Sequence, residues 1–160
     1  MSEGKSGQSG EQSEARRPRR GSPEQTRALL VETAAKVFNT VPYTETDTNQ
    51  IAKQAGYATG TFYRHFKDKR EVFIAAFELF LKDEWDSIQK SVMSGASAGD
   101  AIDAAIDALI GFHRRWRVFR SNVKAVATYD EELRLLTLKK RREELMQIST
   151  LRKAMGSPER

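Results

Sequence analysis

The 160-residue sequence contains no cysteine and only two histidines. The absence of cysteine excludes disulfides, thiolate metal sites and a cysteine nucleophile, and two histidines with scattered carboxylates offer little material for a metal site. No stretch approaches the ~20 apolar residues of a membrane-spanning helix, and the N-terminus lacks the apolar core of a signal peptide. These absences predict a cytoplasmic protein with no metal, no cofactor and no membrane partner.

The sequence also lacks the residue sets that mark an enzyme. It has no recognisable combination of nucleophile, base and acid, no cluster of metal ligands and no glycine-rich loop that would hold a phosphate. Its 27 basic and 22 acidic residues give a net charge of +5, a mild bias toward polyanionic partners. We therefore expect a binding protein rather than an enzyme.

Residues 1–21 consist largely of Ser, Gly, Glu, Gln and Arg, a composition that cannot form a core and predicts disorder. The segment ends in four arginines, at positions 16, 17, 19 and 20. Two interpretations stay open for them. They form either a solvated basic run or an arm that follows phosphates or the minor groove beside a DNA-binding domain.

Beyond this tail the apolar residues recur with helical spacing, and no segment alternates with a period of two, which predicts an all-α fold. Ser22 and Gln25 have the spacing of a capping box around Pro23, and Asp47 and Gln50 have the same spacing. Pro42 and Gly56 are expected to end the first two helices. We expect helices at about 23–41, 47–55, 59–66, 69–93, 98–113, 117–127 and 131–153.

The stretch 51–69 predicts two short helices joined by a tight turn at Gly56. A helix-turn-helix needs a small residue there, because two steeply crossing helices leave no room for a side chain. In the second helix Phe62 and Phe66 are expected to face inward, and most of its other residues are polar. The polar side chains belong to Thr59, Thr61, Tyr63 and His65. Hydroxyl, phenol and imidazole groups in this arrangement are typical of a helix that binds phosphates and enters a groove of DNA.

This motif resembles the TetR family of transcriptional regulators, over roughly residues 24–80. The family pattern corresponds to Ile51-Ala52, Ala55-Gly56-Tyr57-Ala58, Gly60-Thr61-Phe62-Tyr63, His65-Phe66 and Lys69. Two positions depart from it: Tyr57 replaces a small aliphatic residue at the turn, and Ala58 replaces the usual Ser or Thr N-cap. Loss of that cap is expected to cost about 1 kcal/mol of local stability.

The resemblance implies a DNA-binding domain at 22–70, with specific contact residues. Those expected to contact bases or phosphates are Thr48, Asn49, Thr59, Gly60, Thr61, Tyr63, Arg64, His65 and Lys69. Of these, Thr59, Gly60, Thr61 and Arg64 would lie in the major groove, and Gly60 would allow the backbone to approach closely. For Tyr63, packing within the domain stays open; for His65 and Lys69, a plain surface role stays open.

The resemblance further implies that residues 71–160 enclose a ligand and form a dimer. The residues expected to line the ligand pocket are Trp85, Ile88, Ile106, Leu109, Phe112, His113, Trp116 and Phe119. His113, four residues after Leu109, is the most suitable polar group for a pocket. The alternative is that these side chains simply form the core, with His113 satisfied inside it.

The last expected helix has an apolar edge beside a block of charged residues at 139–144. The edge consists of Leu135, Leu138, Leu145, Ile148 and Leu151. The region is shorter than the family usually has, and three explanations stay open: a shortened member, a fragment, or a different mode of dimerisation.

The expected function is that of a homodimeric repressor in the bacterial cytoplasm, associated with the nucleoid. It would bind a palindromic operator and be released by a small apolar ligand. The alternative is a truncated regulator that acts as an interaction or heterodimerisation protein without its own response to a ligand. The oligomeric state discriminates between the two.

Overall fold

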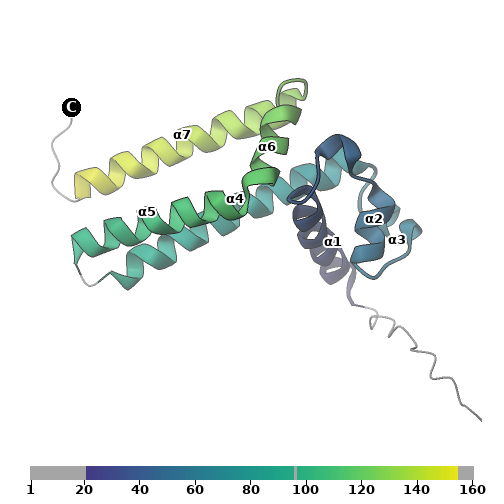
Figure 1. The fold of residues 1–160 in the computed structure, drawn as a ribbon, viewed down its shortest axis with the longest axis horizontal. Coiled ribbons are helices and arrows are strands. Elements are labelled where there is room, and N and C mark those ends of the chain that lie inside the picture. The colour runs from purple at the N-terminus through teal and green to yellow at the C-terminus, as the bar shows by residue number, and fades with distance from the viewer. Residues whose placement is uncertain (1–20, 96, 155–160) are drawn as a thin grey trace, which may run out of the picture.

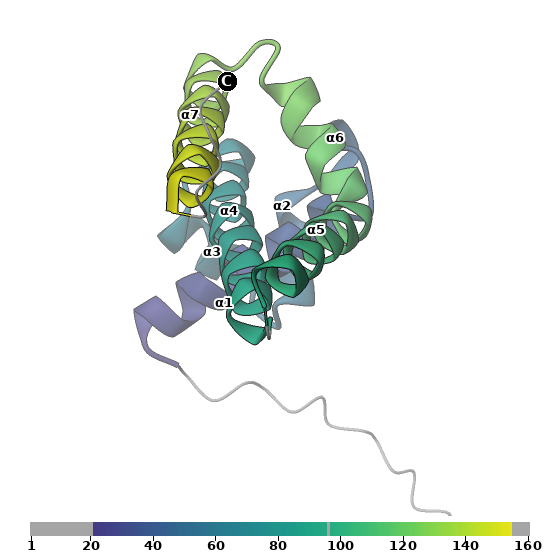
Figure 2. The same cartoon turned by 90° about the vertical axis from the view of Figure 1, so that its left-hand side faces the viewer.

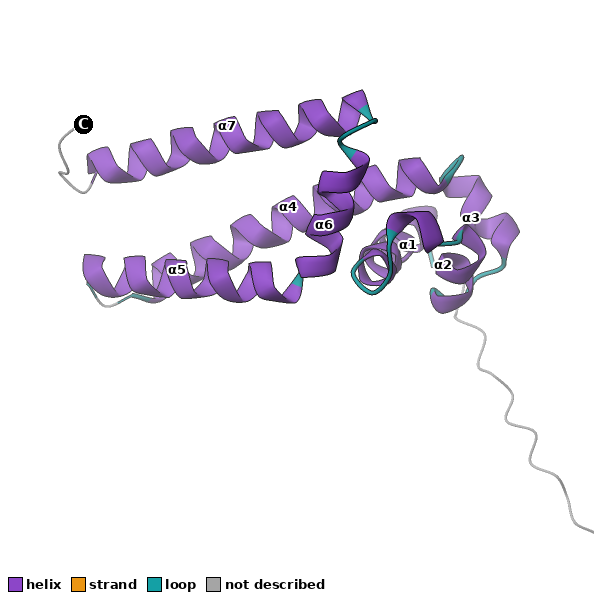
Figure 3. Ribbon diagram, turned by 45° about the horizontal axis from the view of Figure 1, so that its top comes forward, coloured by secondary structure: helices purple, strands orange, loops and turns teal. Residues whose placement is uncertain are grey.

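The structure is a computed structural model that describes residues 21–95 and 97–154. Within these ranges every regular element is helical, which confirms the predicted all-α class (Figure 3). The elements are α1 (Pro23–Phe38), the 3-10 turn η1 (Tyr43–Glu45), α2 (Thr48–Gln54), α3 (Thr59–His65), α4 (Lys69–Ser94), α5 (Ala98–Arg115), α6 (Arg117–Val126) and α7 (Glu131–Ala154). None of the described helices is long and apolar enough to cross a membrane. The predicted disordered tail, with its four arginines, lies outside the described residues.

The helix starts follow from the capping residues. Ser22 and Gln25 form the predicted capping box of α1: the Gln25 N–H donates to Ser22 Oγ at 3.3 Å, and the Ser22 N–H donates to Gln25 Oε1 at 3.0 Å. Asp47 caps α2 as predicted, but its carboxylate accepts from the N–H of Asn49 at 3.0 Å, and Gln50 takes no part in the cap. The expected second capping box is therefore an ordinary N-cap.

Helix α4 is the axis of the molecule. The short helices α1, α2 and α3 gather at its N-terminal end, and α5 returns along its C-terminal part (Figure 1). Helix α6 then turns away from α5, and α7 runs back on the other side of α4 (Figures 1 and 2). The turn η1, which follows Pro42, was not predicted.

The N-terminal and C-terminal halves share one apolar core. The ring of Phe73 in α4 lies 4.7 Å from that of Phe38 in α1 and 5.5 Å from that of Phe119 in α6, measured between centroids. All three rings are fully buried. The predicted division at residue 70 therefore marks no break in packing, and it stays a prediction about roles.

Asn122 in α6 is a buried polar link between the halves. Its side-chain amide donates to the carbonyl groups of Phe38 at 2.7 Å and Val41 at 2.9 Å, and its oxygen accepts from the N–H of Tyr43 at 2.8 Å. The end of a helix leaves backbone carbonyls without intrahelical partners. Helix α6 supplies those partners for α1, so the two helices are held in a fixed relation.

Candidate nucleic-acid interface

The turn between α2 and α3 depends on glycine. Gly56 has φ 80, a conformation that residues with a side chain rarely adopt. The Gly56 N–H donates to the Lys53 carbonyl at 3.1 Å, and the Tyr57 N–H donates to the Ala52 carbonyl at 2.9 Å. This pair of bonds is a Schellman motif, so α2 stops within one residue and the chain turns at once into α3.

The two departures from the family pattern have different consequences. Tyr57 is half-buried against the core, and its hydroxyl accepts a 3.4 Å hydrogen bond from Thr26 of α1. The larger turn residue thus gains a partner instead of clashing. Ala58 takes the N-cap position of α3 with no side-chain hydrogen bond, as its methyl group requires.

Helix α3 is anchored by two aromatic residues. Phe62 and Phe66 are 0% and 1% exposed, as predicted, and their ring centroids lie 5.6 Å apart. The guanidinium of Arg27 in α1 lies over the Phe66 ring at 4.7 Å, a cation–π contact. With this face buried, the polar residues of α3 are left on the outside.

The N-terminal ends of α2 and α3 are joined by a chain of side-chain hydrogen bonds. The Thr59 hydroxyl donates to Asn49 Oδ1 at 2.8 Å, and the Asn49 amide donates to both Asp47 carboxylate oxygens at 3.1 Å. The N–H of Asn49, and next its side-chain amide, hold the pKa of Asp47 below its usual value. Asn49 and Thr59, both predicted DNA contacts, are therefore brought together and oriented before any ligand binds.

Tyr63 and Thr48 form a second link between the same helices. Their hydroxyl groups lie 3.0 Å apart in a hydrogen bond, and Thr48 is buried. Tyr63 remains 53% exposed, and its ring packs edge-to-face with that of Phe62, with the two centroids 5.3 Å apart. The phenol is thus held by the domain and also faces the solvent, and its contact with phosphate stays a prediction.

The remaining predicted residues of α3 lie at or near the surface. Gly60 is exposed, and a Cβ added there would meet no heavy atom within 4 Å, so packing within the chain does not require glycine. The exposed Arg64 donates to the Thr61 hydroxyl at 3.0 Å. His65 is half-buried.

Lys69 has partners that the sequence did not indicate. Its ammonium donates to the carbonyl groups of Tyr43 at 2.8 Å and Thr46 at 2.9 Å, and it lies over the Tyr43 ring at 4.5 Å. Lys69 therefore fastens the turn η1, which leads into α2. An ammonium has three N–H donors, so one remains for an anion.

The predicted pocket residues of the C-terminal half lie in different surroundings. Phe112 and Phe119 are buried, with ring centroids 5.0 and 5.3 Å from Phe80, and Trp116 lies 5.8 Å from the same ring. Trp85, Ile88 and Leu109 are partly buried, and Ile106 is 49% exposed. Phe112, Trp116 and Phe119 thus pack with the core, which is the alternative that the sequence left open, and a role of the set in ligand binding stays a prediction.

His113 belongs to a polar cluster that joins three helices. Its Nε2 lies 2.6 Å from Oε1 of the buried Glu84 in α4, and the other oxygen of Glu84 lies 3.2 Å from the ammonium of Lys140 in α7. Lys140 also lies 3.6 Å from Glu144. The sequence analysis missed Glu84, although its position four residues after Phe80 places it on the apolar stripe of α4 and indicates a buried carboxylate.

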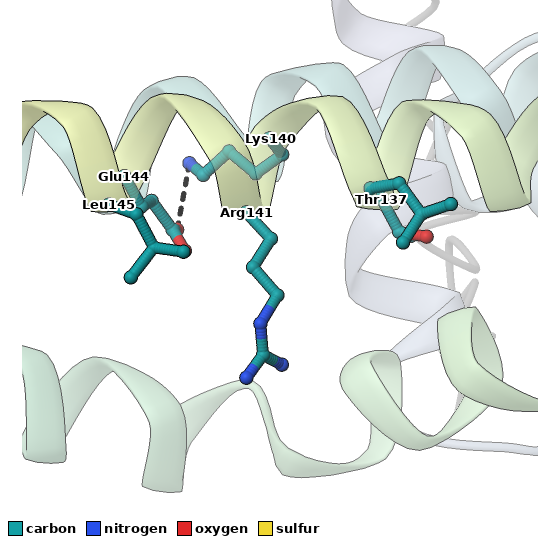
Figure 4. A pocket seen from close by; sticks show the side chains of 6 residues that line it. Thr137, Lys140, Arg141, Glu144 and Leu145 are labelled. Carbon is teal, nitrogen blue, oxygen red and sulfur yellow. Dashed lines mark ion pairs between the residues drawn. The ribbon is translucent and has the colours of Figure 1, made fainter.

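A hollow of about 430 Å³ lies beside α7. It is lined by Thr137, Leu138, Lys140, Arg141, Glu144 and Leu145. Arg141 extends from α7 across the hollow toward the ribbon that lies opposite (Figure 4). None of these residues belongs to the predicted pocket set. The described residues contain no group of His, Cys, Asp and Glu side chains that could hold a metal ion.

The N-terminal region of the chain resembles known proteins. Residues 30–76 match the sequence family described as bacterial regulatory proteins, tetR family. The chain is 27% identical over 77 residues to the fatty acid metabolism regulator protein of Bacillus subtilis (strain 168), covering 48% of this chain and 40% of that protein. It is 26% identical over 100 residues to the uncharacterized HTH-type transcriptional regulator YhgD of the same organism, covering 60% and 52%.

A third relative is the HTH-type transcriptional regulator AcrR of Shigella flexneri, 36% identical over 56 residues, which are 35% of this chain and 26% of that protein. The chain thus spans about half or less of the length of these relatives. Among solved structures, it resembles a protein of Shewanella sp. PV-4 assigned to the tetR family of transcription regulators. The TM-score is 0.59 and the identity 22%, over 82% of this chain and 71% of that one, a likeness of fold.

Proposed function

Because residues 30–76 match the tetR family of bacterial regulatory proteins, we propose that this protein is a sequence-specific DNA-binding transcriptional regulator. The observation that carries the proposal is the helix-turn-helix of α2 and α3. Its second helix is anchored by Phe62 and Phe66 and leaves its polar side chains on the outside. We assign residues 22–70 to DNA binding and residues 71–160 to ligand binding and dimerisation.

In this proposal α3 lies in the major groove. Thr59, Thr61 and Arg64 read base edges, and Gly60 admits the DNA backbone or a base edge where a side chain would stand in the way. Asn49, which already holds the Thr59 hydroxyl, contributes from the start of α2.

Phosphate contacts come from groups at the rim of the helix-turn-helix. They are the exposed phenol of Tyr63, the hydroxyl of Thr48 through its bond to that phenol, the imidazole of His65 and the third N–H of Lys69. These contacts would fix the position of the protein on the duplex without reading its sequence.

We further propose that the protein acts as a homodimeric repressor that a small apolar ligand releases from a palindromic operator. A ligand between the C-terminal helices can release DNA only if it favours one arrangement of the two halves over another. The link from Asn122 in α6 to the end of α1 supplies a rigid connection along which such a change would reach the helix-turn-helix.

Selection of bound DNA from a random pool, with light scattering on the same preparation, tests the proposal. A palindrome bound by a dimer is the expected result. Thr59→Ala should relax the selected sequence, and Thr40→Ala, at an exposed threonine two residues after the end of α1, is the matched control. Failure to enrich any sequence, with weak and sequence-indifferent binding by a monomer, would instead support the interaction protein.

A further inference from the structure

One carboxylate fixes the orientation of the side chains that join the N-terminal ends of α2 and α3. The amide nitrogen of Asn49 donates to both carboxylate oxygens of Asp47 at 3.1 Å. The backbone N–H of Asn49, and next its side-chain amide, hold the pKa of Asp47 below its usual value, so the carboxylate is ionised at neutral pH. An ionised carboxylate only accepts hydrogen bonds, so the Asn49 atom that faces it is the nitrogen. The amide oxygen therefore faces Thr59.

The same carboxylate thereby sets the polarity of the Thr59 hydroxyl. Asn49 Oδ1 lies 2.8 Å from Thr59 Oγ1, and an amide oxygen only accepts, so this bond uses the single O–H donor of Thr59. The two lone pairs of the Thr59 oxygen are left, and the residue is partly exposed at the start of α3. Thr59 therefore offers acceptors only to a molecule that lies in front of α3.

Thr61, two residues further along α3, has the opposite polarity. Its oxygen accepts from the guanidinium of Arg64 at 3.0 Å, so its own O–H is left to donate. A guanidinium has donors only, and Arg64 thus adds further groups of the same kind. Two threonines of one helix therefore differ in what they can bind, and the difference comes from their charged neighbours.

We propose that Asp47, acting through Asn49, makes Thr59 an acceptor that selects a base amino group in the major groove. The base that Thr59 contacts is then adenine or cytosine, whose N6 and N4 amino groups donate, and not guanine or thymine, whose O6 and O4 accept. Asp47 is a positioning residue, because it acts on the base only through Asn49 and Thr59. The proposal rests on the proposed function for the placement of α3 in the groove, and adds the class of base edge that is read there.

The base pair that Thr59 contacts is found by selecting bound DNA with the wild type and with Thr59→Val, which keeps the shape of threonine without its hydroxyl. The preference should be lost at one base pair of each half-site. Two modified duplexes then report the polarity: at this pair one lacks the exocyclic amino group, and the other lacks the exocyclic keto oxygen. The wild type should bind the first about threefold to tenfold more weakly than unmodified DNA, and Thr59→Val should show no such loss. The second should affect both proteins alike. Thr61→Val, the matched control, should keep the wild-type loss on the first duplex.

Asp47→Asn tests the role of the carboxylate and retains the cap of α2, since asparagine caps a helix as well as aspartate does. A neutral amide there no longer forces the Asn49 amide into one orientation, so Thr59 is free to donate as well. The variant should bind random DNA more tightly, because it removes a negative charge, and yet lose less than about twofold on the duplex without the amino group. Glu45→Gln, at an exposed carboxylate just before α2, should also bind more tightly but keep the wild-type loss.

Circular dichroism checks that each variant is folded, and Thr59→Ala provides the same comparison without the β-branch. If Thr59→Val abolishes a loss on the duplex without the keto oxygen instead, Thr59 donates and the proposal is wrong. A selected sequence that Thr59→Val leaves unchanged would also overturn it, and full wild-type discrimination by Asp47→Asn would overturn the role of Asp47. In these cases the wild type still selects a sequence, and the proposed function stands. If the wild type selects no sequence, the proposed function fails and the assignment of Thr59 fails with it.

Discussion

Some side chains of the helix-turn-helix that are predicted to contact DNA also hold the domain together. Lys69 is the clearest example. It is predicted to bind phosphate, and its ammonium donates to two backbone carbonyl groups in the turn before α2. Tyr63 likewise holds Thr48 while more than half of its surface is exposed. Tyr63 thus holds α3 to α2, and Lys69 holds the turn before α2 to the start of α4, before DNA is present. This reduces the ordering cost of binding.

Lys69→Met should lower the free energy of unfolding by about 1–3 kcal/mol, because two partly buried carbonyls lose a charged donor. Lys67→Met, at an exposed lysine two residues earlier, removes the same charge and should leave stability within about 0.5 kcal/mol. Chemical denaturation measures both. Equal stability of the two variants would show that the hydrogen bonds of Lys69 do not stabilise the fold. If Lys69→Met then lowers the salt slope of DNA binding by about 1, the role of Lys69 is phosphate contact.

At the scale of the elements, short-range signals located the helices well. Proline, glycine and capping residues lie within a few positions of the ends that they determine, so Ser22 and Asp47 could be identified without knowledge of the fold. The partners of Lys69, and of Glu84 with His113, could not be identified, because they lie 23 or more residues apart in the sequence. Such contacts depend on how whole helices are arranged.

The ion pair between Arg70 and Asp130 joins the start of α4 to the start of α7. The hydrogen bond from Arg70 holds the pKa of Asp130 below its usual value, against an opposing effect of burial. A carboxyl group with a lower pKa in the folded chain binds fewer protons there than when unfolded. Its contribution is therefore complete above the unfolded pKa near 4 and is lost as the pH falls through the folded pKa.

Asp130→Asn should therefore lower stability at pH 7 by about 1 kcal/mol and flatten the loss of stability in acid. The replacement retains an oxygen that can accept from the N–H of Leu133, so the start of α7 keeps its cap. Glu45→Gln, at an exposed carboxylate, is the control that should follow the wild-type curve. Denaturation midpoints between pH 3 and 7 measure the effect. Parallel curves for Asp130→Asn and the wild type would show that this pair does not couple folding to pH.

At the scale of the whole molecule, the shared core and the hydrogen bonds of Asn122 join the helix-turn-helix to the C-terminal helices. We therefore expect the two halves to unfold together. Both tryptophans lie in the C-terminal half, so their fluorescence reports that half, whereas circular dichroism reports all helices. The two signals should give one coincident transition in the wild type. Asn122→Ala should lower the free energy of unfolding by about 2–3 kcal/mol and so move the transition to lower denaturant. The reason is that it leaves backbone groups at the end of α1, in the following turn and at the start of η1 without partners. Lys124→Ala, on the exposed side of the same helix, should shift the transition little. Two separate transitions in the wild type would show that the halves fold independently, and α6 could then carry no signal to the DNA-binding helices.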